Sequence, residues 1–155
     1  MEIKIEAIAI VKNKREGLSD DFWGGILTEV ELLPHIPSAS LNGIETFSHL
    51  EILFQFDKVS DATIVFSGHP RGNKEWPDIG IFAQRKKDRP NRLGLTIVEL
   101  VERKERSLLV KNLDAINGTP VIDIKPIMKE FLPDSPIKQP GWATELMVDY
   151  WKNRQ

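Results

Sequence analysis

Five basic residues gather in a short stretch that reads FAQRKKDRPNRLGL from Phe82 to Leu95. Within eight residues this stretch holds one acid, Asp88, and the cations Arg85, Lys86, Lys87, Arg89 and Arg92. Most runs of charge are solvated loops, but Pro90 stiffens the backbone in the middle of this one, and a purely solvating loop gains nothing from stiffness. The stretch is therefore a candidate functional segment rather than an ordinary solvated loop.

A second candidate follows in the segment DAINGTPVIDIKP from Asp114 to Pro126. Its Asn-Gly pair is a strong turn signal, and Asp123 and Lys125 alternate with apolar residues in the strand expected after the turn. Loops at strand ends are where a rigid β scaffold usually carries its ligand groups. Taken alone, the segment is explained equally well by a simple hairpin turn.

Several common catalytic sites are disfavoured by the residues present. The chain has no cysteine, no Gly-x-Gly-x-x-Gly after a strand and no P-loop motif, so a thiol nucleophile and a Rossmann or P-loop nucleotide site are unsupported. Its three histidines form no His-x-x-x-His pair, and we expect no metal site. Ser48 and His49 are neighbours whose side chains should point to opposite sides of a strand, which argues against a serine–histidine couple.

Length and charge limit the possible classes of protein. With 155 residues, of which 41% are hydrophobic, the chain is expected to form one domain with a real core. Its 21 basic and 23 acidic residues disfavour a general affinity for nucleic acid or anionic membranes, so any contact with a polyanion must be local. No apolar run approaches the roughly 18 residues of a membrane span, and the N-terminus does not look like a signal peptide. We expect a soluble, cytoplasmic protein.

The elements that must position these groups are mostly strands. Alternation or short apolar runs predict strands near residues 3–10, 26–33, 47–56, 62–67, 79–83, 95–101, 108–113 and 119–126. Many short strands with few helical periods favour an all-β sandwich or barrel. A short C-terminal helix is predicted in PGWATELMVDYWKN, where Leu146 and Tyr150, and Met147 and Trp151, are four residues apart.

Three separated motifs, LNGIETFSHLEILFQF, GIFAQRKKDRPNRLGL and DAINGTPVIDIKP, together resemble the TsaA-like (TrmO) family of S-adenosylmethionine-dependent methyltransferases. The family pattern is met at Gly80, Phe82, Ala83, Arg85, Arg89, Pro90 and Asn91. The resemblance implies an all-β fold, a small β-barrel of residues 1–130. From the proline-rich stretch and the helical spacing, we expect residues 131–155 to form a C-terminal arm and helix packed on the same domain. The resemblance also implies a homodimer that methylates the exocyclic nitrogen of threonylcarbamoyl-adenosine beside the tRNA anticodon.

The resemblance implies S-adenosylmethionine as the cofactor and suggests which residues bind it. Arg85 can receive the carboxylate of this cofactor, and Asp114 and Asn117 can accept hydrogen bonds from its cationic groups. By resemblance alone, the cofactor set also includes Leu95, Ala115, Ile116, Asp57 and Lys58. Methyl transfer from a sulfonium needs positioning and electrostatics rather than a nucleophile. Asp114 and Asp123 are candidate acceptors for the proton that leaves the acceptor nitrogen, although water could also take it.

The expected substrate residues depart from the pattern of the tRNA enzymes. Members of the family that act on tRNA typically read TRSPFRPNPIGLS and DLLDGTPVLDIKPY, whereas this chain has lysines for Ser-Pro, Arg92 for the second proline and Asn117 for the aspartate. We nevertheless expect tRNA as the partner. The residues assigned to substrate binding are Lys86, Lys87, Arg89, Asn91 and Arg92.

Two other functions are compatible with the altered motifs. One is a methyltransferase that acts on another RNA or on a small molecule, and the other is a module that binds the cofactor or RNA without turnover. Phe22 and Trp23 are either stacking partners for a base, as in readers of single-stranded RNA, or packing residues.

Overall fold

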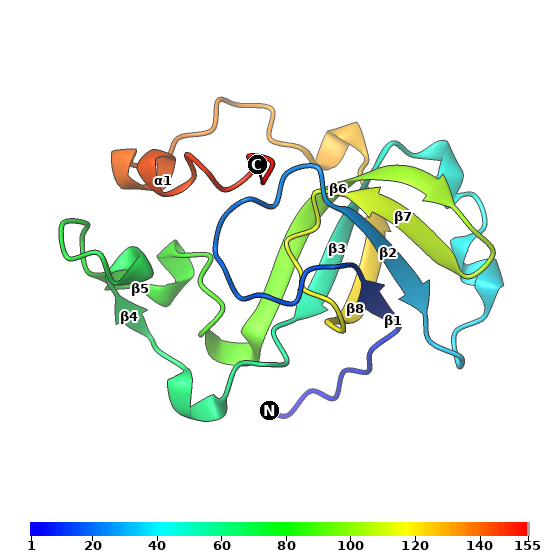
Figure 1. The fold of residues 1–155 in the computed structure, drawn as a ribbon, viewed down its shortest axis with the longest axis horizontal. Helices are drawn as coiled ribbons and strands as arrows, with labels where there is room; N and C mark the ends of the chain where they lie inside the picture. Colours follow the sequence, from blue (N-terminus) through cyan, green and yellow to red (C-terminus); the bar gives the residue numbers. More distant parts are fainter. Residues whose placement is uncertain (155) are drawn as a thin grey trace.

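The chain folds as a closed β-barrel flanked by a small lobe and by a C-terminal strap, which we define as residues 141–154 (Figure 1). The computed structural model describes residues 1–154. The barrel strands are β1 (Ala9–Lys12), β2 (Leu27–Leu32), β3 (His49–Gln55), β6 (Leu93–Arg103), β7 (Ser107–Lys111) and β8 (Pro120–Pro126). They close in the order β1-β2-β7-β6-β3-β8, and neighbouring strands are antiparallel. The expected all-β barrel is confirmed.

Alternation along the strands explains how the barrel is filled. In β6, Thr96 and Val98 are buried. Leu95 and Ile97, which alternate with them, are 42% and 47% exposed on the outer face. The same alternation in the other strands sends apolar side chains inward, where they form one core. Its best buried members are Ala9, Val11, Val30, Leu50, Ile52, Phe54, Val98, Leu108, Val110 and Val121. Because the sheet closes on itself, the barrel leaves no long strand edge to pair with another chain.

Gly94 is the point where a ring packs directly on the backbone of β6. A Cβ atom at Gly94 would lie 2.5 Å from the ring of Phe54, which is 1% exposed, and 3.0 Å from the ring of Phe56. The two rings are themselves packed edge to face, with centroids 5.3 Å apart. The close approach therefore leaves no volume for a side chain at this position.

We expect the Gly94→Ala variant to lose about 1–3 kcal/mol of unfolding free energy, because overpacking forces a buried ring or the backbone to move. Thermal unfolding followed by circular dichroism measures this loss. Gly80→Ala is the matched control, because Gly80 has a φ of -61° and its Cβ would meet no atom within 4 Å. Equal melting temperatures for the two variants would contradict the packing argument.

A small lobe leaves the barrel between β3 and β6. It contains a short two-stranded sheet, β4 (Ser67–Gly68) and β5 (Ile79–Gly80), which lies well to one side of the barrel in Figure 1. Within residues 1–154 the connections include the 3-10 helices Ser38–Leu41, Ile44–Thr46, Asp61–Thr63, Pro70–Gly72, Ile81–Ala83, Pro90–Arg92 and Lys129–Phe131. The basic stretch of the sequence ends this lobe and leads directly into β6. No helix in the described residues has the length and apolar character needed to cross a membrane.

The strap begins with the helix α1 (Gly141–Leu146), which faces the small lobe, and then returns toward the barrel (Figure 1). The Trp76 indole Nε1 donates to Glu145 Oε2 at 2.9 Å, and the rings of Trp76 and Trp142 lie 6.4 Å apart. The amides of Phe22 and Trp23 donate to the carbonyls of Asp149 and Tyr150 at 3.1 and 2.8 Å. The strap thus contacts both the small lobe and the loop before β2. Gln155, the last residue of the predicted arm, lies outside the described residues.

Four expected elements are wrong in extent. The strand expected at residues 79–83 is limited to Ile79–Gly80, because Ile81–Ala83 form a 3-10 helix. The first strand starts at Ala9 rather than near Ile3, and Ala9 pairs with Leu32, the last residue of β2. Residues 61–63 form a 3-10 helix instead of a strand, because the Ser60 side chain caps the Ala62 amide. The C-terminal helix stops at Leu146, because the carbonyls of Asp149 and Tyr150 bond the loop before β2.

Candidate cofactor site

Adjacent residues of β6 bring Arg85 and Asp114 to the same place. The Arg85 guanidinium donates a short hydrogen bond to the carbonyl of Leu95, and the Thr96 hydroxyl donates a short one to Asp114 Oδ1. Leu95 points outward, whereas Thr96 is only 5% exposed. Three residues of the expected cofactor set, Arg85, Leu95 and Asp114, therefore meet at two adjacent residues of β6. The Arg85 guanidinium and the Asp114 carboxylate are thus held at adjacent residues of β6, and the Leu95 side chain adds an apolar surface on the outer face of the strand.

The second oxygen of Asp114 is bonded by a residue from the strap. Tyr150 Oη donates to Asp114 Oδ2 at 2.5 Å, so each carboxylate oxygen accepts a hydroxyl hydrogen. Burial raises the pKa of the Tyr150 phenol far above its usual value of 10.0, and the charge of Asp114 raises it further, so the hydroxyl stays protonated and donates. The sequence indicated Tyr150 only as a residue of the predicted C-terminal helix, since neither its spacing nor its neighbours mark it as a partner of Asp114.

The segment after Asp114 packs against the strand that starts the barrel. Ala115 is buried and its carbonyl accepts from Asn13 Nδ2 at 2.9 Å. The Asn117 side chain accepts from the Asn13 amide at 3.3 Å, and the Asn117 amide donates to the carbonyl of Arg15 at 2.8 Å. Gly118 has a φ of +84°, which confirms the turn predicted at Asn-Gly. Ile116 is half-buried between these contacts.

Asp123 lies on the outer wall of the barrel, on the same side as the exposed Leu95 side chain. Leu53 of β3 pairs with Leu95 on one side and with Asp123 on the other. The backbones of Leu95 and Asp123 are therefore two strand spacings apart, or roughly 10 Å. Asp123 bonds the Ile124 amide at 2.9 Å and pairs with Lys125. Together with Glu51, Leu53 and Leu95, these two residues line a surface pocket. The two candidate proton acceptors therefore occupy different surroundings.

The cations of the basic stretch have different surroundings. Arg89 Nη1 donates to the carbonyl of Gln84 at 2.8 Å, and Arg92 Nη1 donates to the carbonyl of Val59 at 2.8 Å and pairs with Asp61 at 2.9 Å. These bonds hold the stretch and the chain after β3 together. Lys86 pairs with Asp88 at 3.5 Å, and Lys87 is half-buried. Asn91 and Arg92 have φ angles of +64° and +52°, which marks a sharp turn just before β6.

Asp57 and Lys58 follow β3 directly and lie against this turn. The two side chains face each other at 3.7 Å, and the amide of the preceding Phe56 donates to the carbonyl of Arg92 at 2.8 Å. Their position therefore follows from that of the basic stretch, although they come from a distant part of the sequence.

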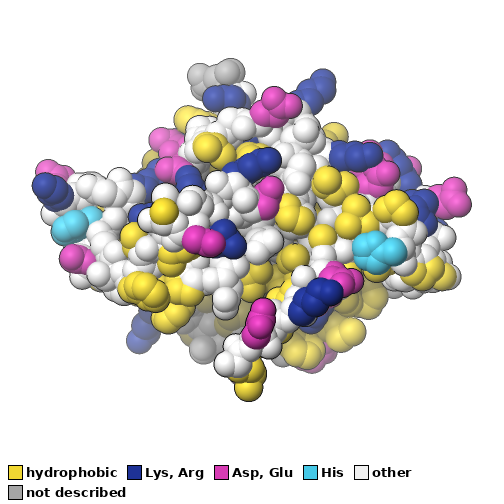
Figure 2. Space-filling model, turned by 90° about the horizontal axis from the view of Figure 1, so that it is seen from below, with side chains coloured by type: hydrophobic (Ala, Val, Ile, Leu, Met, Phe, Trp, Pro, Cys, Tyr) yellow, Lys and Arg dark blue, Asp and Glu magenta, His cyan; other side chains and the backbone are white. Residues whose placement is uncertain are grey.

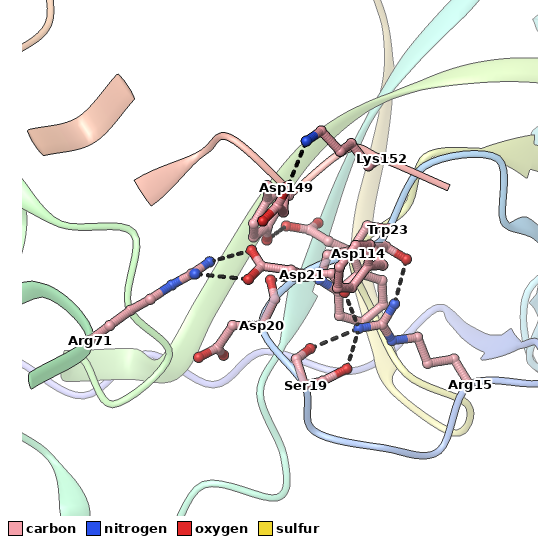
Figure 3. Close-up of polar contacts among 11 residues, drawn as sticks. Arg15, Ser19, Asp20, Asp21, Trp23, Arg71, Asp114, Asp149 and Lys152 are labelled. Carbon is pink, nitrogen blue, oxygen red and sulfur yellow. Dashed lines mark hydrogen bonds and ion pairs between the residues drawn. The ribbon is translucent and has the colours of Figure 1, made fainter. Parts of the chain in front are cut away.

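Sequence reasoning missed Arg15, which organises the loop before β2 (Figure 3). Its guanidinium donates to the carbonyls of Ser19, Asp21 and Phe22, each at 2.7 Å, and to the Ser19 hydroxyl at 2.8 Å. It also lies 3.5 Å from the centre of the Trp23 ring. The signal was weak, because one arginine among several charges near the N-terminus has no distinguishing spacing.

The contacts around Arg15 decide between the two roles considered for Trp23. This side chain is 6% exposed beneath the guanidinium, so it is a packing residue. Beside it, Arg71 of the small lobe makes a two-pronged pair with Asp21 at 2.9 and 2.7 Å, and these bonds raise the pKa of Arg71 (Figure 3). The loop before β2 therefore connects the strap with the small lobe.

The expectation for Ser48 and His49 is wrong. The Ser48 hydroxyl and His49 Nδ1 lie 2.8 Å apart, because Ser48 precedes β3 and is not bound by strand alternation. The His49 side chain is exposed. In the part of the chain that the structure describes, no group of three or more His, Cys, Asp or Glu side chains could hold a metal ion.

Fold and site together define a class: a small antiparallel β-barrel with a cation, an apolar side chain and a carboxylate grouped at one of its strands. The family model of the tRNA-methyltransferase O N-terminal domain matches residues 21–132. The chain therefore belongs to this family, as the motifs predicted.

Relatives and solved structures agree with this membership. A probable S-adenosyl-L-methionine-binding protein of Methanothermobacter thermautotrophicus is 35% identical over 134 residues, which cover 84% of this chain and 93% of the relative. The tRNA (adenine(37)-N6)-methyltransferase of Escherichia coli is 35% identical over 127 residues, 77% of this chain and 54% of that enzyme. The crystal structure of TrmO from Pseudomonas aeruginosa shares the fold, with a TM-score of 0.72 and 23% identity over 92% of this chain and 62% of that one.

The chain is much shorter than several of its relatives. It spans 54% of the Escherichia coli enzyme and 22% of the human tRNA (adenine(37)-N6)-methyltransferase, which is 39% identical over 103 residues and 64% of this chain. The family match covers β2 to β8 and the small lobe.

Proposed function

We propose that the chain binds S-adenosylmethionine at Arg85, Leu95 and Asp114 and transfers the methyl group to the exocyclic nitrogen of threonylcarbamoyl-adenosine beside the tRNA anticodon. The observation that carries this proposal is the grouping of these three residues at β6 in a member of the tRNA-methyltransferase O family. The names of the relatives support S-adenosylmethionine as the cofactor and N6 of adenine 37 in tRNA as the position that is methylated.

The residues at β6 fit the chemistry of the cofactor. Arg85 is exposed and has five N–H donors, of which the hydrogen bond to Leu95 uses one, so a carboxylate can be bound by the others. Asp114 offers acceptor lone pairs to an ammonium or a sulfonium, and Leu95 offers an apolar surface. The cofactor supplies an activated methyl group, and the chain contributes orientation and charge.

Asp114 suits cation binding better than proton transfer. Both of its oxygens already accept hydroxyl hydrogens, which fixes the carboxylate in one orientation. Asp123 is paired with Lys125. A water molecule or the acceptor's own carbonyl groups can take the proton, so we assign no general base on the chain.

We propose that the chain contacts tRNA through a small local surface beside the cofactor site. Figure 2 shows positive and negative side chains interspersed on one face of the molecule, with apolar patches between them. With a net charge of -2, the chain has no excess of cations to hold tRNA everywhere. Lys86 and Lys87 lie next to Arg85 in the sequence, so they are placed to meet a phosphate near the methyl group.

We also infer a homodimer. The outer face of β6 exposes Leu95, Ile97 and Val101 at 42%, 47% and 45%, an apolar row that a second copy could cover. Light scattering coupled to size-exclusion chromatography measures the mass directly. A mass near 17.7 kDa at micromolar concentration would contradict the inference.

The decisive test of function uses the purified chain, cofactor labelled in the methyl group, and tRNA that lacks only this methyl group. Label recovered in the modified adenosine of digested tRNA would establish the reaction. Cofactor binding by calorimetry without transfer would favour the binding module or another acceptor. Absence of cofactor binding would refute the proposal.

To test the tRNA contact, we use the double variant Lys86→Ala/Lys87→Ala, which should bind tRNA more weakly. The slope of log Kd against log salt concentration should decrease by roughly one to two. Arg92 is kept in this variant because its bonds to Val59 and Asp61 hold the loop. The exposed pair Lys4→Ala/Lys138→Ala removes the same charge elsewhere and serves as the control. Equal slopes for the two double variants would place the tRNA on another surface.

A further inference from the structure

We propose that the strap completes the cofactor site, with Tyr150 as a positioning residue that holds the Asp114 carboxylate in its binding orientation. This inference rests on the proposed role of Asp114 in binding the cofactor. It adds a residue from outside the family domain, since the family match ends at residue 132.

The geometry at Asp114 carries the first step. Tyr150 Oη donates to Oδ2 at 2.5 Å while the Thr96 hydroxyl donates to Oδ1. Two donors from two different elements fix both the rotation of the carboxylate and the direction of its remaining lone pairs. A ligand cation then meets an acceptor that needs no reorganisation, which strengthens binding at little entropic cost.

The second step is that Tyr150 cannot easily leave this position. The Trp23 amide bonds the Tyr150 carbonyl at 2.8 Å, and the Phe22 amide bonds the preceding carbonyl at 3.1 Å. The Tyr150 ring packs edge to face on Trp151, with centroids 5.0 Å apart. The backbone carbonyls of Asp149 and Tyr150 are therefore held by the loop that Arg15 organises.

Gly24 shows how closely the strap and this loop are fitted. A Cβ atom at Gly24 would lie 1.9 Å from the carbonyl oxygen of Trp151. Any side chain at this position must push the strap away from the loop, and with it the residue next to Trp151, Tyr150. Gly24 thus provides a way to displace Tyr150 without touching Asp114, Thr96 or Arg85.

Tyr150 also gives the inference a direct spectroscopic readout, because it is the chain's only tyrosine. Tyrosinate absorbance therefore reports a single group. Burial and Asp114 raise its pKa, so ionisation in the folded protein should begin only well above pH 10. The other charged groups close enough to act on it are Arg85, Asp20, Arg15 and Arg71.

The closing experiment compares Tyr150→Phe, Gly24→Ala and the control Gly17→Ala, for which a Cβ would meet no atom within 4 Å. Tyr150→Phe keeps the ring and should raise the Kd for S-adenosylmethionine roughly tenfold, with the melting temperature nearly unchanged. Gly24→Ala should raise the Kd similarly and move the tyrosinate midpoint down toward 10. Gly17→Ala should match the unsubstituted protein in both.

The outcomes separate this inference from the proposed function. If the unsubstituted protein binds no S-adenosylmethionine, the proposed function fails, and the tyrosinate titration alone shows whether Asp114 holds Tyr150. If it binds the cofactor and Tyr150→Phe binds equally well, the positioning role is overturned. A Gly24→Ala protein that keeps the high tyrosinate midpoint would overturn the seating of the strap.

Discussion

The Arg15→Ala variant should lose about 2–4 kcal/mol of unfolding free energy, the largest effect on stability that we expect from a single substitution outside the barrel core. Arg15 is only 8% exposed, and its guanidinium donates to three backbone carbonyls of the loop before β2. Alanine leaves these carbonyls without a donor and removes the cation that packs on the Trp23 ring.

The damage should spread from this loop to the strap. Phe22 and Trp23, whose amides hold the strap, lie in the segment that Arg15 orders. We therefore expect Arg15→Ala to lower the melting temperature and also to shift the tyrosinate midpoint of Tyr150 downward. Circular dichroism and absorbance measure the two effects on one sample.

Lys14→Ala is the control for this experiment, because Lys14 is the exposed neighbour of Arg15 and carries the same charge. Arg15→Lys should recover only part of the stability. A lysine ammonium lacks the planar set of N–H donors with which the guanidinium bonds several carbonyls at once. If Arg15→Ala and Lys14→Ala melt at the same temperature, the loop does not depend on the guanidinium.

The Arg85→Ala variant should weaken S-adenosylmethionine binding by about 10- to 100-fold, the largest effect that we expect on function without loss of the fold. Arg85 is exposed, and its only hydrogen bond among the described residues is to the Leu95 carbonyl at the strand that also holds Asp114. Its removal therefore takes away the proposed carboxylate receptor and leaves the core intact.

Lys86→Ala is the matched control, because Lys86 is the adjacent cation and pairs with Asp88 instead. Calorimetry with S-adenosylmethionine should show a small change for Lys86→Ala and a large one for Arg85→Ala. Arg85→Lys should lie between them, because it keeps the charge and loses the paired donors. Equal affinities for Arg85→Ala and Lys86→Ala would refute the assignment of Arg85.

Much of the barrel could be predicted because its information is local. Strand alternation such as that of β6, where Thr96 and Val98 face inward and Leu95 and Ile97 outward, is written in consecutive residues. The Asn-Gly turn before β8 was equally readable, since it needs only a glycine at a positive φ. Strand ends were predicted less well, because they depend on where the neighbouring strand stops.

The candidate site was partly predictable for a different reason. The motif around Arg85 and the segment from Asp114 were found through their resemblance to a family, and the barrel brings both to β6. Asp123 was included because it follows the same motif, but its strand carries it to the outer wall. There it shares a surface pocket with Leu95, whereas the Asp114 carboxylate is bonded by Thr96 and Tyr150, and the role of Asp123 as a proton acceptor stays a prediction.

The all-β class and the family could be determined from the sequence by itself, because both depend on residue types at short spacing. The same motif predicts Arg85 as the carboxylate receptor. Only the tertiary structure decided that Tyr150 reaches Asp114 and that Arg15 holds the loop beneath the strap. Tyr150 and Asp114 are 36 residues apart, and their contact exists only after the strap has packed on a loop from the other end of the chain. No local pattern records such a contact, because it arises from packing between elements that are distant in the sequence.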